Sequence, residues 1–262
     1  MNNKKTTSWG AVADWYDSLL TSKDSFQNKV ILPNLLRLME IKSGEKILDV
    51  GCGTGFFAAE FSKAGAKVSG IDVGEELLVI ARKNAPKAEF KSASAEALPF
   101  GNEIFDKVVF VLALQNMADM KKAVSEAART LKSGGKIFLV LNHPAFRIPK
   151  QSDWVFDEEK KIQYRRIDKY LSELKEKIQT HPSTGSKSSG QVPGDKPEDY
   201  TISFHRPLQF YFKALNKSGF AVRRLEEWNS HKQSEWGPRQ EAEDIARKEI
   251  PLFLMMEAIK LI

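Results

Sequence analysis

The sequence predicts an α/β fold, with one mostly parallel sheet in a single large domain that carries an insertion. Residues 46–72 follow the pattern of a strand, a glycine turn, a helix and a second strand. Apolar runs then alternate with amphipathic segments as far as Leu141, which is the pattern of a doubly wound sheet. At 262 residues and 42% hydrophobic content, the chain can bury one large core, and a second full domain is not expected.

Residues 9–16 and 30–39 are predicted to form two N-terminal helices, the second with an apolar face available for packing. The first predicted strand follows, and its apolar run at residues 47–50 leads into Gly51, Gly53 and Gly55. Without a Cβ, the backbone there can take positive φ and let a ligand lie against main-chain N–H groups. Apolar residues at helical spacing follow directly after Gly55, so a helix is predicted to begin at the turn and to point its N-terminus at the ligand.

Asp72 ends the second strand. In doubly wound folds, an acid at this position hydrogen-bonds the ribose hydroxyls of the ligand. A dinucleotide fingerprint requires G-x-G-x-x-G, but the sixth position counted from Gly51 is Phe56. The stretch instead resembles motif I of class I S-adenosylmethionine (SAM)-dependent methyltransferases, an acid followed by G-x-G-x-G, with Asp72 matching the acid of motif II. The resemblance implies SAM as the cofactor and a Rossmann-like seven-stranded sheet, mostly parallel with an antiparallel last strand.

The resemblance also gives the N-terminal segment a role. Residues 1–40 resemble the lid helices of small-molecule methyltransferases, in which a tyrosine before motif I often borders the cofactor or the acceptor. Tyr16 is the matching residue, and it is a candidate for the catalytic site. Packing in the core is the alternative for this side chain.

A second helix is predicted over residues 77–81 and a third strand over residues 88–94. Residues 94–100 resemble the D-A-E-x-L-P-F signature of a broad group that includes the ubiquinone and menaquinone C-methyltransferases. Ser94 stands where this signature has aspartate, so a neutral oxygen would accept the hydrogen bond of the adenine amino group. The cofactor contacts that the resemblance implies fall on Asp49, Gly51, Cys52, Gly53, Gly55, Asp72, Val73, Ser94, Ala95, Glu96 and Leu112.

Residues 105–114 form the most apolar run and predict a central parallel strand that is buried on both faces. Gln115 and Asn116 follow at its exit, which in the family lies beside the transferable methyl group. Base-amino methyltransferases of DNA and RNA usually carry Asn or Asp followed by Pro-Pro and an aromatic residue here, and this chain does not. Gln115 is a candidate substrate-binding residue, although ordinary turn polarity explains it equally well.

A helix over residues 119–131, ended by the glycines after Ser133, precedes a strand over residues 136–141. This strand delivers His143 to the carboxyl edge of the sheet, where ligands bind in open α/β folds. Because an imidazole suits proton removal near neutral pH, His143 is the candidate general base. A structural hydrogen bond is the alternative role.

Residues 145–206 depart from the doubly wound pattern and form an aromatic and basic insertion. Its first part is predicted to cap the acceptor pocket, and residues 180–197, rich in Ser, Gly, Pro and Lys, are predicted to form a flexible loop. A solvated excursion is the alternative. Guanidinium groups suit a carboxylate or a phosphate on the acceptor, and the candidate substrate-binding residues here are Arg147, Trp154, Tyr164 and Arg165.

The chain ends with a predicted helix over residues 206–218 and strands over residues 221–228 and 251–261, joined by a charged loop. A helix, a Gly-Phe pair and a final hairpin are how class I methyltransferase sheets end. The resemblance therefore covers residues 46–141 by motif and residues 207–262 by topology.

Charge, cysteine content and hydropathy limit the expected binding partners and the expected cellular compartment. The net charge of +6 leaves nucleic acid or an acidic small molecule open, but basic residues stand beside acids, as at Glu126 and Arg129. That arrangement indicates a solvated helix face and does not favour nucleic acid. Cys52 is the only cysteine and no zinc-like spacing exists, so neither a disulfide nor a metal is expected. The polar residues 1–8 and the lack of a membrane-length apolar run predict a cytoplasmic protein without a membrane span.

The sequence thus predicts a SAM-dependent methyltransferase that methylates an oxygen, nitrogen or carbon atom of a small-molecule acceptor, acidic or aromatic in character. RNA methylation and SAM binding without turnover are two alternatives, and an NAD-linked oxidoreductase is a third. The acceptor, the atom methylated and the oligomeric state are left open.

Overall fold

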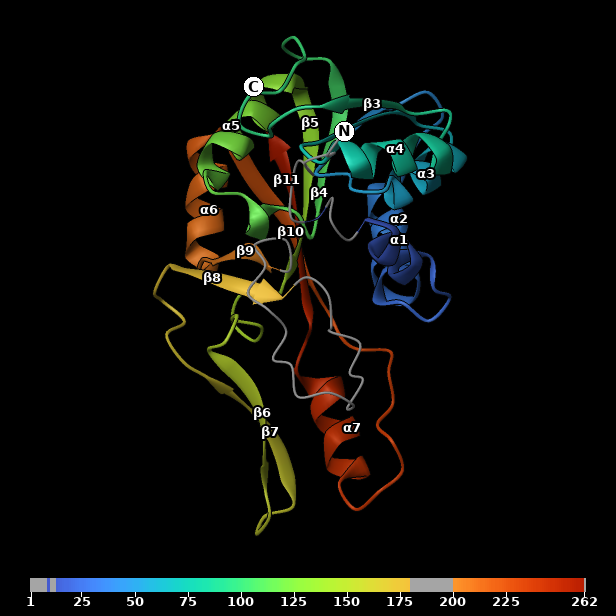
Figure 1. Ribbon diagram of the computed structural model, residues 1–262. Coiled ribbons are helices and arrows are strands. Elements are labelled where there is room, and N and C mark those ends of the chain that lie inside the picture. The colour runs from blue at the N-terminus through green and yellow to red at the C-terminus, as the bar shows by residue number, and fades with distance from the viewer. Residues whose placement is uncertain (1–8, 10–12, 180–199, 262) are drawn as a thin grey trace.

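The computed structural model describes residue 9 and residues 13–179 and 200–261 (Figure 1). Its centre is a seven-stranded sheet in the order β10-β11-β5-β4-β1-β2-β3. The strands are β1 (Lys46–Val50), β2 (Lys67–Asp72), β3 (Glu89–Ser92), β4 (Phe105–Val111), β5 (Leu131–Asn142), β10 (Phe220–Trp228) and β11 (Phe253–Lys260). Strand β11 runs antiparallel to both of its neighbours, while β1 to β5 pair in parallel. The predicted class I methyltransferase sheet is confirmed.

Helices cover both faces of the sheet (Figure 1). One face carries α1 (Ala13–Thr21), a π-helical turn η2 (Gln27–Ile31), α2 (Leu32–Met39), α3 (Phe56–Lys63) and α4 (Glu75–Asn84). The other face carries α5 (Met120–Thr130) and α6 (Leu208–Lys217). None of the described helices is long and apolar enough to cross a membrane.

Strand β5 shows how the sheet separates two halves of the core. Its alternate residues Ile137, Leu139 and Leu141 pack with α5 and α6, whereas Phe138 and Val140 pack with α2 and α3. All five side chains are buried, as the period-2 geometry of a strand between two helical layers requires. The carboxyl ends of the parallel strands are thereby fixed at one edge.

Several element predictions were wrong in detail. Strand β5 begins at Leu131 and not at residue 136, so the glycines predicted to end the preceding helix lie within the strand. The first helix, α1, begins at Ala13 and continues to Thr21, five residues beyond the predicted end at Tyr16. The segment between the last two strands is not only a charged loop, because it contains the helix α7 (Gln240–Glu249). Among the residues of α7 only Ala246 is buried. The apolar residues Ala242, Ile245 and Ala246 do stand at helical spacing, but they are few among many charged residues, and the sequence interpretation missed this signal.

The insertion consists of two β-hairpins. Strands β6 (Ser152–Asp157) and β7 (Ile162–Ile167) form the first, and β8 (Leu174–Gln179) and β9 (Tyr200–His205) form the second. In Figure 1 the first hairpin extends away from the sheet, where β7 packs against α7, whereas the second lies close to the end of the sheet. Strand β9 packs against the short helix η3 (Leu114–Asn116) after β4. The predicted loop at residues 180–197 lies outside the described residues.

Candidate functional site

The turn after β1 requires glycine for two separate reasons. Gly51, Gly53 and Gly55 have φ values of +74°, +53° and +77°, which lie in the left-handed region. In addition, a Cβ on Gly51 would lie 2.7 Å from the Cβ of Ala113, and one on Gly55 would lie 2.9 Å from the Cβ of Ala81. The turn is therefore packed directly against the exit of β4 and against α4.

The amide groups of this turn are already used within the protein. Gly51 and Cys52 both donate to the carbonyl of Ile71, at 2.8 and 3.0 Å. Gly55 donates to the carbonyl of Cys52 at 3.0 Å, and Gly53 donates to Oδ2 of Asp72 at 3.0 Å. The prediction that these N–H groups face a ligand is therefore wrong. What the glycines supply is a close approach of backbone to the space above the turn.

That space is a cavity of about 550 Å³ at the carboxyl ends of β1, β2 and β4, a size typical of small-molecule sites. Of the predicted cofactor residues, those that line it are Gly51, Gly53, Asp72, Val73, Ser94, Ala95, Glu96 and Leu112. Three others, Asp49, Cys52 and Gly55, do not line the cavity. The motif residues thus converge on one site, although from four different loops.

Two buried carboxylates lie beneath and beside the cavity. Asp72 accepts hydrogen bonds from Gly53 N at 3.0 Å and Gly74 N at 2.9 Å, and burial nevertheless raises its pKa. Asp49 is 2% exposed and forms no hydrogen bond or ion pair with any described residue through its carboxylate. Burial first, and then the charge of Asp72, raise the pKa of Asp49 to about 7. Two acids without a basic partner favour a cation in the cavity.

Tyr16 lines the cavity from the N-terminal side, and its ring contacts that of Trp9 in a tilted arrangement, with the centroids 5.1 Å apart and an interplanar angle of 55°. Its Cε1 atom lies 3.5 Å from the place where a Cβ on Gly53 would stand. Burial, followed by the charges of Asp72 and Asp49, raises the pKa of Tyr16 to about 12. The phenol is therefore protonated at neutral pH, and it can act as a hydrogen-bond donor but not as a base.

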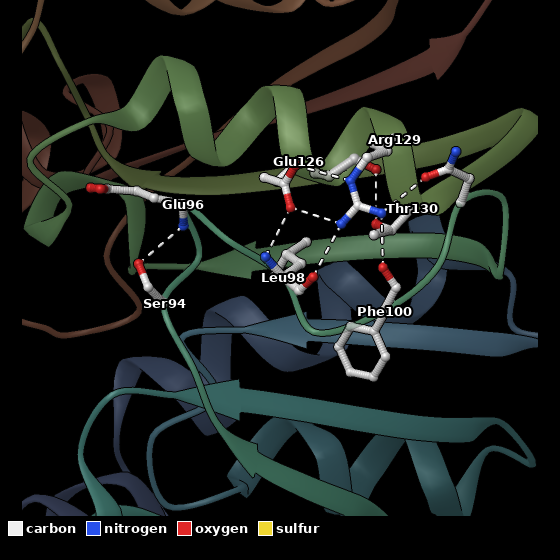
Figure 2. A network of polar contacts seen from close by, with 9 residues as sticks. Ser94, Glu96, Leu98, Phe100, Glu126, Arg129 and Thr130 are labelled. Carbon is white, nitrogen blue, oxygen red and sulfur yellow. Dashed lines mark hydrogen bonds and ion pairs between the residues drawn. The ribbon is translucent and has the colours of Figure 1, made fainter.

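A polar network fixes the loop that carries Ser94, Ala95 and Glu96 (Figure 2). Oγ of Ser94 accepts from Glu96 N at 3.1 Å, and Oε2 of Glu126 accepts from Leu98 N at 2.9 Å. Arg129 pairs with Glu126 at 2.8 Å and donates to the carbonyls of Leu98 and Phe100, at 3.1 and 2.8 Å. The interpretation of Glu126 and Arg129 as a merely solvated face was wrong, because both hold this loop onto α5.

Replacing Arg129 by methionine is expected to lower the free energy of unfolding by about 2–4 kcal/mol. The change leaves a half-buried carboxylate and two loop carbonyls without their donor, while methionine keeps much of the packing volume. We also expect the affinity for SAM to fall about 10-fold as the loop at 94–96 loosens. Urea unfolding and calorimetric titration measure the two effects. Lys122→Met, on the exposed side of the same helix, is the control; equal losses in both variants would contradict the role of the network.

His143 lies away from the cavity, so the geometry gives no support to its candidate role as the general base. It does not line the cavity; its Nε2 lies 2.7 Å from Oε1 of Glu227, and its Nδ1 accepts from Ala145 N and Phe146 N. Because Nδ1 is an acceptor, Nε2 carries the proton and donates it to Glu227. Burial lowers the pKa of His143, against the opposing effect of Glu227. The neutral ring ties the end of β5 to β10.

The predicted cap residues also lie elsewhere. Arg147, Trp154 and Arg165 line a second and smaller pocket, and Tyr164 is 45% exposed on the first hairpin. None of the four lines the large cavity. They belong to the loop after β5 and to the β6–β7 hairpin, which extends away from the sheet (Figure 1). The geometry therefore gives no support to these four residues as a lid over the acceptor.

The second hairpin supplies the wall that the sequence interpretation missed. Ile178 from β8 and Thr201, Ile202 and Ser203 from β9 line the cavity. Apolar and polar residues alternate along residues 200–205, and this period-2 pattern is the signal that could have identified β9 as a strand. The hairpin completes the cavity on the side of η3.

Arg206, at the end of β9, holds the loop after β4 in place. Its guanidinium donates to the carbonyls of Met117 and Ala118 at 2.8 and 2.9 Å, and it is 4% exposed. Gln115 and Asn116 both line the cavity. Oε1 of Gln115 is buried and has no hydrogen-bond partner among the described residues, so this acceptor is available to a donor in the cavity.

The chain matches a family model, over the part that carries the glycine turn and the parallel strands, and it also matches curated relatives. Residues 48–139 match the family model described as a methyltransferase domain. The chain is 36% identical over 118 residues to a demethylmenaquinone methyltransferase of Chlorobaculum parvum, covering 45% of this chain and 49% of that protein. It thus spans about half the length of the curated relatives it matches.

Solved structures match over more of the chain. A SAM-dependent methyltransferase of Mesorhizobium loti superposes with a TM-score of 0.64 and 26% identity, over 86% of this chain and 96% of that one. A Listeria monocytogenes protein described as a SAM-dependent methyltransferase gives a TM-score of 0.66 at 22% identity, over 87% and 97% of the two chains. The second likeness, at this identity, establishes the fold alone.

Proposed function

The chain belongs to the class I SAM-dependent methyltransferases, and from this premise we propose that it transfers a methyl group to a small-molecule acceptor. The observation that carries the proposal is the cavity above the glycine turn, which is lined by the buried carboxylate of Asp72. The charge of Asp72 also raises the pKa of a second buried acid, Asp49, which lies behind the lining residues. A sulfonium cofactor with a ribose fits this arrangement, whereas a pyrophosphate, being anionic, does not.

Each part of SAM has a proposed partner in the chain. The Asp72 carboxylate accepts from the ribose hydroxyls, as it already accepts from Gly53 N and Gly74 N. Ser94 and Ala95 lie on the loop proposed to border the adenine, and Asp49 lies beneath the cationic end. When bound, SAM supplies an activated methyl group on a positively charged sulfur.

The contribution of the protein to the reaction is proposed to be positional. Holding the acceptor and the methyl group in line, away from water, is worth roughly 7–11 kcal/mol in comparable intramolecular reactions. Gln115 and the protonated Tyr16 can orient an acceptor by accepting and donating hydrogen bonds. His143 takes no part in this scheme, since it lies outside the cavity.

The acceptor is proposed to be neutral and largely apolar. Met117, Ala118, Ile178 and Ile202 contribute apolar surface on the side of η3 and the second hairpin. Among the described lining residues there is no lysine, arginine or histidine to receive a carboxylate or phosphate. The same absence gives no support to a nucleic-acid acceptor, whose binding depends on basic side chains. The acidic acceptor expected from the sequence is therefore replaced in this proposal by an uncharged one.

Binding of SAM is expected to release protons near neutral pH. A cation beside Asp49 lowers its pKa from about 7, so a carboxyl that is partly protonated in the free protein becomes ionised. Affinity should accordingly rise between pH 6 and pH 8. Calorimetry in buffers of different ionisation enthalpy measures the number of protons released when SAM binds. A separate titration with NADH tests the alternative cofactor. Tight NADH binding with no heat from SAM would overturn the proposed function.

Turnover is tested by the formation of S-adenosylhomocysteine with panels of neutral, acidic and RNA acceptors. Ile178→Asp should reduce kcat/KM for a neutral acceptor at least about 10-fold, because a carboxylate is costly in an apolar wall. The affinity for SAM should change little. Lys177→Asp, at the neighbouring exposed position of β8, is the matched control. SAM binding without product from any panel would favour a SAM-binding protein without turnover.

A further inference from the structure

A second pocket of about 170 Å³ lies between the loop after β5, the β6–β7 hairpin and the segment entering β11. Its lining residues are Phe146, Arg147, Trp154, Arg165, Ile250, Pro251 and Leu252, none of which lines the large cavity. The pocket therefore has its own walls, and its only charged lining residues among those described are two arginines.

The flat face of each guanidinium group packs against an aromatic ring. The Cζ atom of Arg147 lies 5.5 Å from the ring centroid of Phe253, and that of Arg165 lies 5.1 Å from the ring of Trp154. Stacking of this kind fixes the plane of a guanidinium but leaves its edge, which carries the N–H donors, free to bind a ligand.

Only part of each edge is used within the protein. Arg147 donates from Nη1 to Oδ1 of Asn142 at 2.8 Å, and Arg165 donates from Nε to the carbonyl of Phe146 at 2.8 Å. Nη2 of Arg165 donates to Oγ of Ser152 at 3.0 Å. No described residue accepts a hydrogen bond from Nε or Nη2 of Arg147, or from Nη1 of Arg165. These uncommitted donors belong to side chains that line the same small pocket.

No ion pair among the described residues balances the positive charge of the pocket, although the more distant carboxylate of Asp153 acts on Arg165 and partly offsets the effect of burial on its pKa. Neither Arg147 nor Arg165 forms an ion pair with any described carboxylate within 4.0 Å. Burial first, and then the charge of Arg165, lower the pKa of Arg147, so the charge of Arg165 disfavours that of Arg147. Because arginine stays charged in proteins, a half-buried pair of like charges is most readily stabilised by an anion between them.

We propose that this pocket binds a small oxyanion, a carboxylate or phosphate group, through the free guanidinium edges of Arg147 and Arg165. Two oxygens of such a group match the fork of N–H donors on a guanidinium. The pocket volume suits inorganic phosphate or a short carboxylate, and its apolar residues Ile250 to Leu252 form the opposite wall. The proposal does not depend on methyl transfer, because the site shares no lining residue with the large cavity.

The test uses the full chain at constant ionic strength, with inorganic phosphate and acetate as separate probes against chloride. Phosphate or acetate, or both, should raise Tm along a saturable curve with a millimolar midpoint. Arg147→Gln and Arg165→Gln should each weaken the midpoint at least fivefold. Arg166→Gln is the matched control, because Arg166 is the next residue of β7 and pairs with Asp168 outside the pocket.

A second measurement keeps the proposal testable if a variant does not fold. In the unmodified protein, the arginine Nε–H signals in NMR spectra should include two that shift along the same saturable curve. Saturation by acetate alone indicates a carboxylate site, and saturation by phosphate alone indicates a phosphate site. A linear response equal to that of chloride, or equal midpoints in Arg165→Gln and Arg166→Gln, would overturn the proposal.

Discussion

Replacing Gly51 by alanine is expected to abolish SAM binding and to lower the free energy of unfolding by about 2–5 kcal/mol. Part of the loss comes from the left-handed backbone, where φ is +74° and a Cβ costs about 1–2 kcal/mol. The rest comes from contact with Ala113, whose Cβ would lie 2.7 Å away. The turn has to shift, and it carries with it the amide of Gly53 that donates to Asp72. Urea unfolding and calorimetric titration with SAM measure both effects.

Gly44→Ala is the control that separates these two causes. Gly44 has a φ of +84° but nothing within 4 Å of an added Cβ, so only the unfavourable backbone conformation lowers the free energy of unfolding of this variant. We expect it to lose about 1–2 kcal/mol and to bind SAM normally. If both variants lose the same stability and both retain SAM binding, the close approach at Gly51 is not what the site requires.

The cofactor side of the cavity could be predicted because its determinants are local. The left-handed turn at Gly51 to Gly55 depends on residues within one short stretch, and Asp72 follows at the end of the next strand. The strand order then brings residues 94–96 and Leu112 to the same edge. The use of the amides of Gly51, Cys52 and Gly53 could not be foreseen, because their acceptors are Ile71 and Asp72 on a neighbouring strand.

The acceptor side depends on packing between distant segments, and sequence reasoning failed there. Which hairpin of the insertion faces the cavity is settled by contacts of β9 with η3 and of β7 with α7. Because α7 was not predicted, its hairpin partner was assigned to the wrong place. His143 illustrates the same limit, since its partner Glu227 is 84 residues away in the chain.

Replacing Asp72 by asparagine is expected to reduce the affinity for SAM at least about 100-fold. Asparagine has one side-chain oxygen, so it can no longer accept from Gly53 N and Gly74 N and also from two ribose hydroxyls. Each hydrogen bond to a charged group contributes about 1.5–3 kcal/mol, and removing two of them gives the expected loss. The change also removes the charge that raises the pKa of Asp49, so less proton release should accompany any residual binding.

Asp106→Asn separates loss of the cofactor site from loss of a structural carboxylate. Asp106 also accepts a backbone hydrogen bond, from Lys46 N at 2.8 Å, but it lies at the opposite end of the sheet and does not line the cavity. Both variants lose a carboxylate bound to main chain, and both should lose about 1–3 kcal/mol of stability. Only Asp72→Asn should lose SAM binding, because only its carboxylate faces the ligand. Equal SAM affinity in the two variants would exclude Asp72 as the ribose-binding residue.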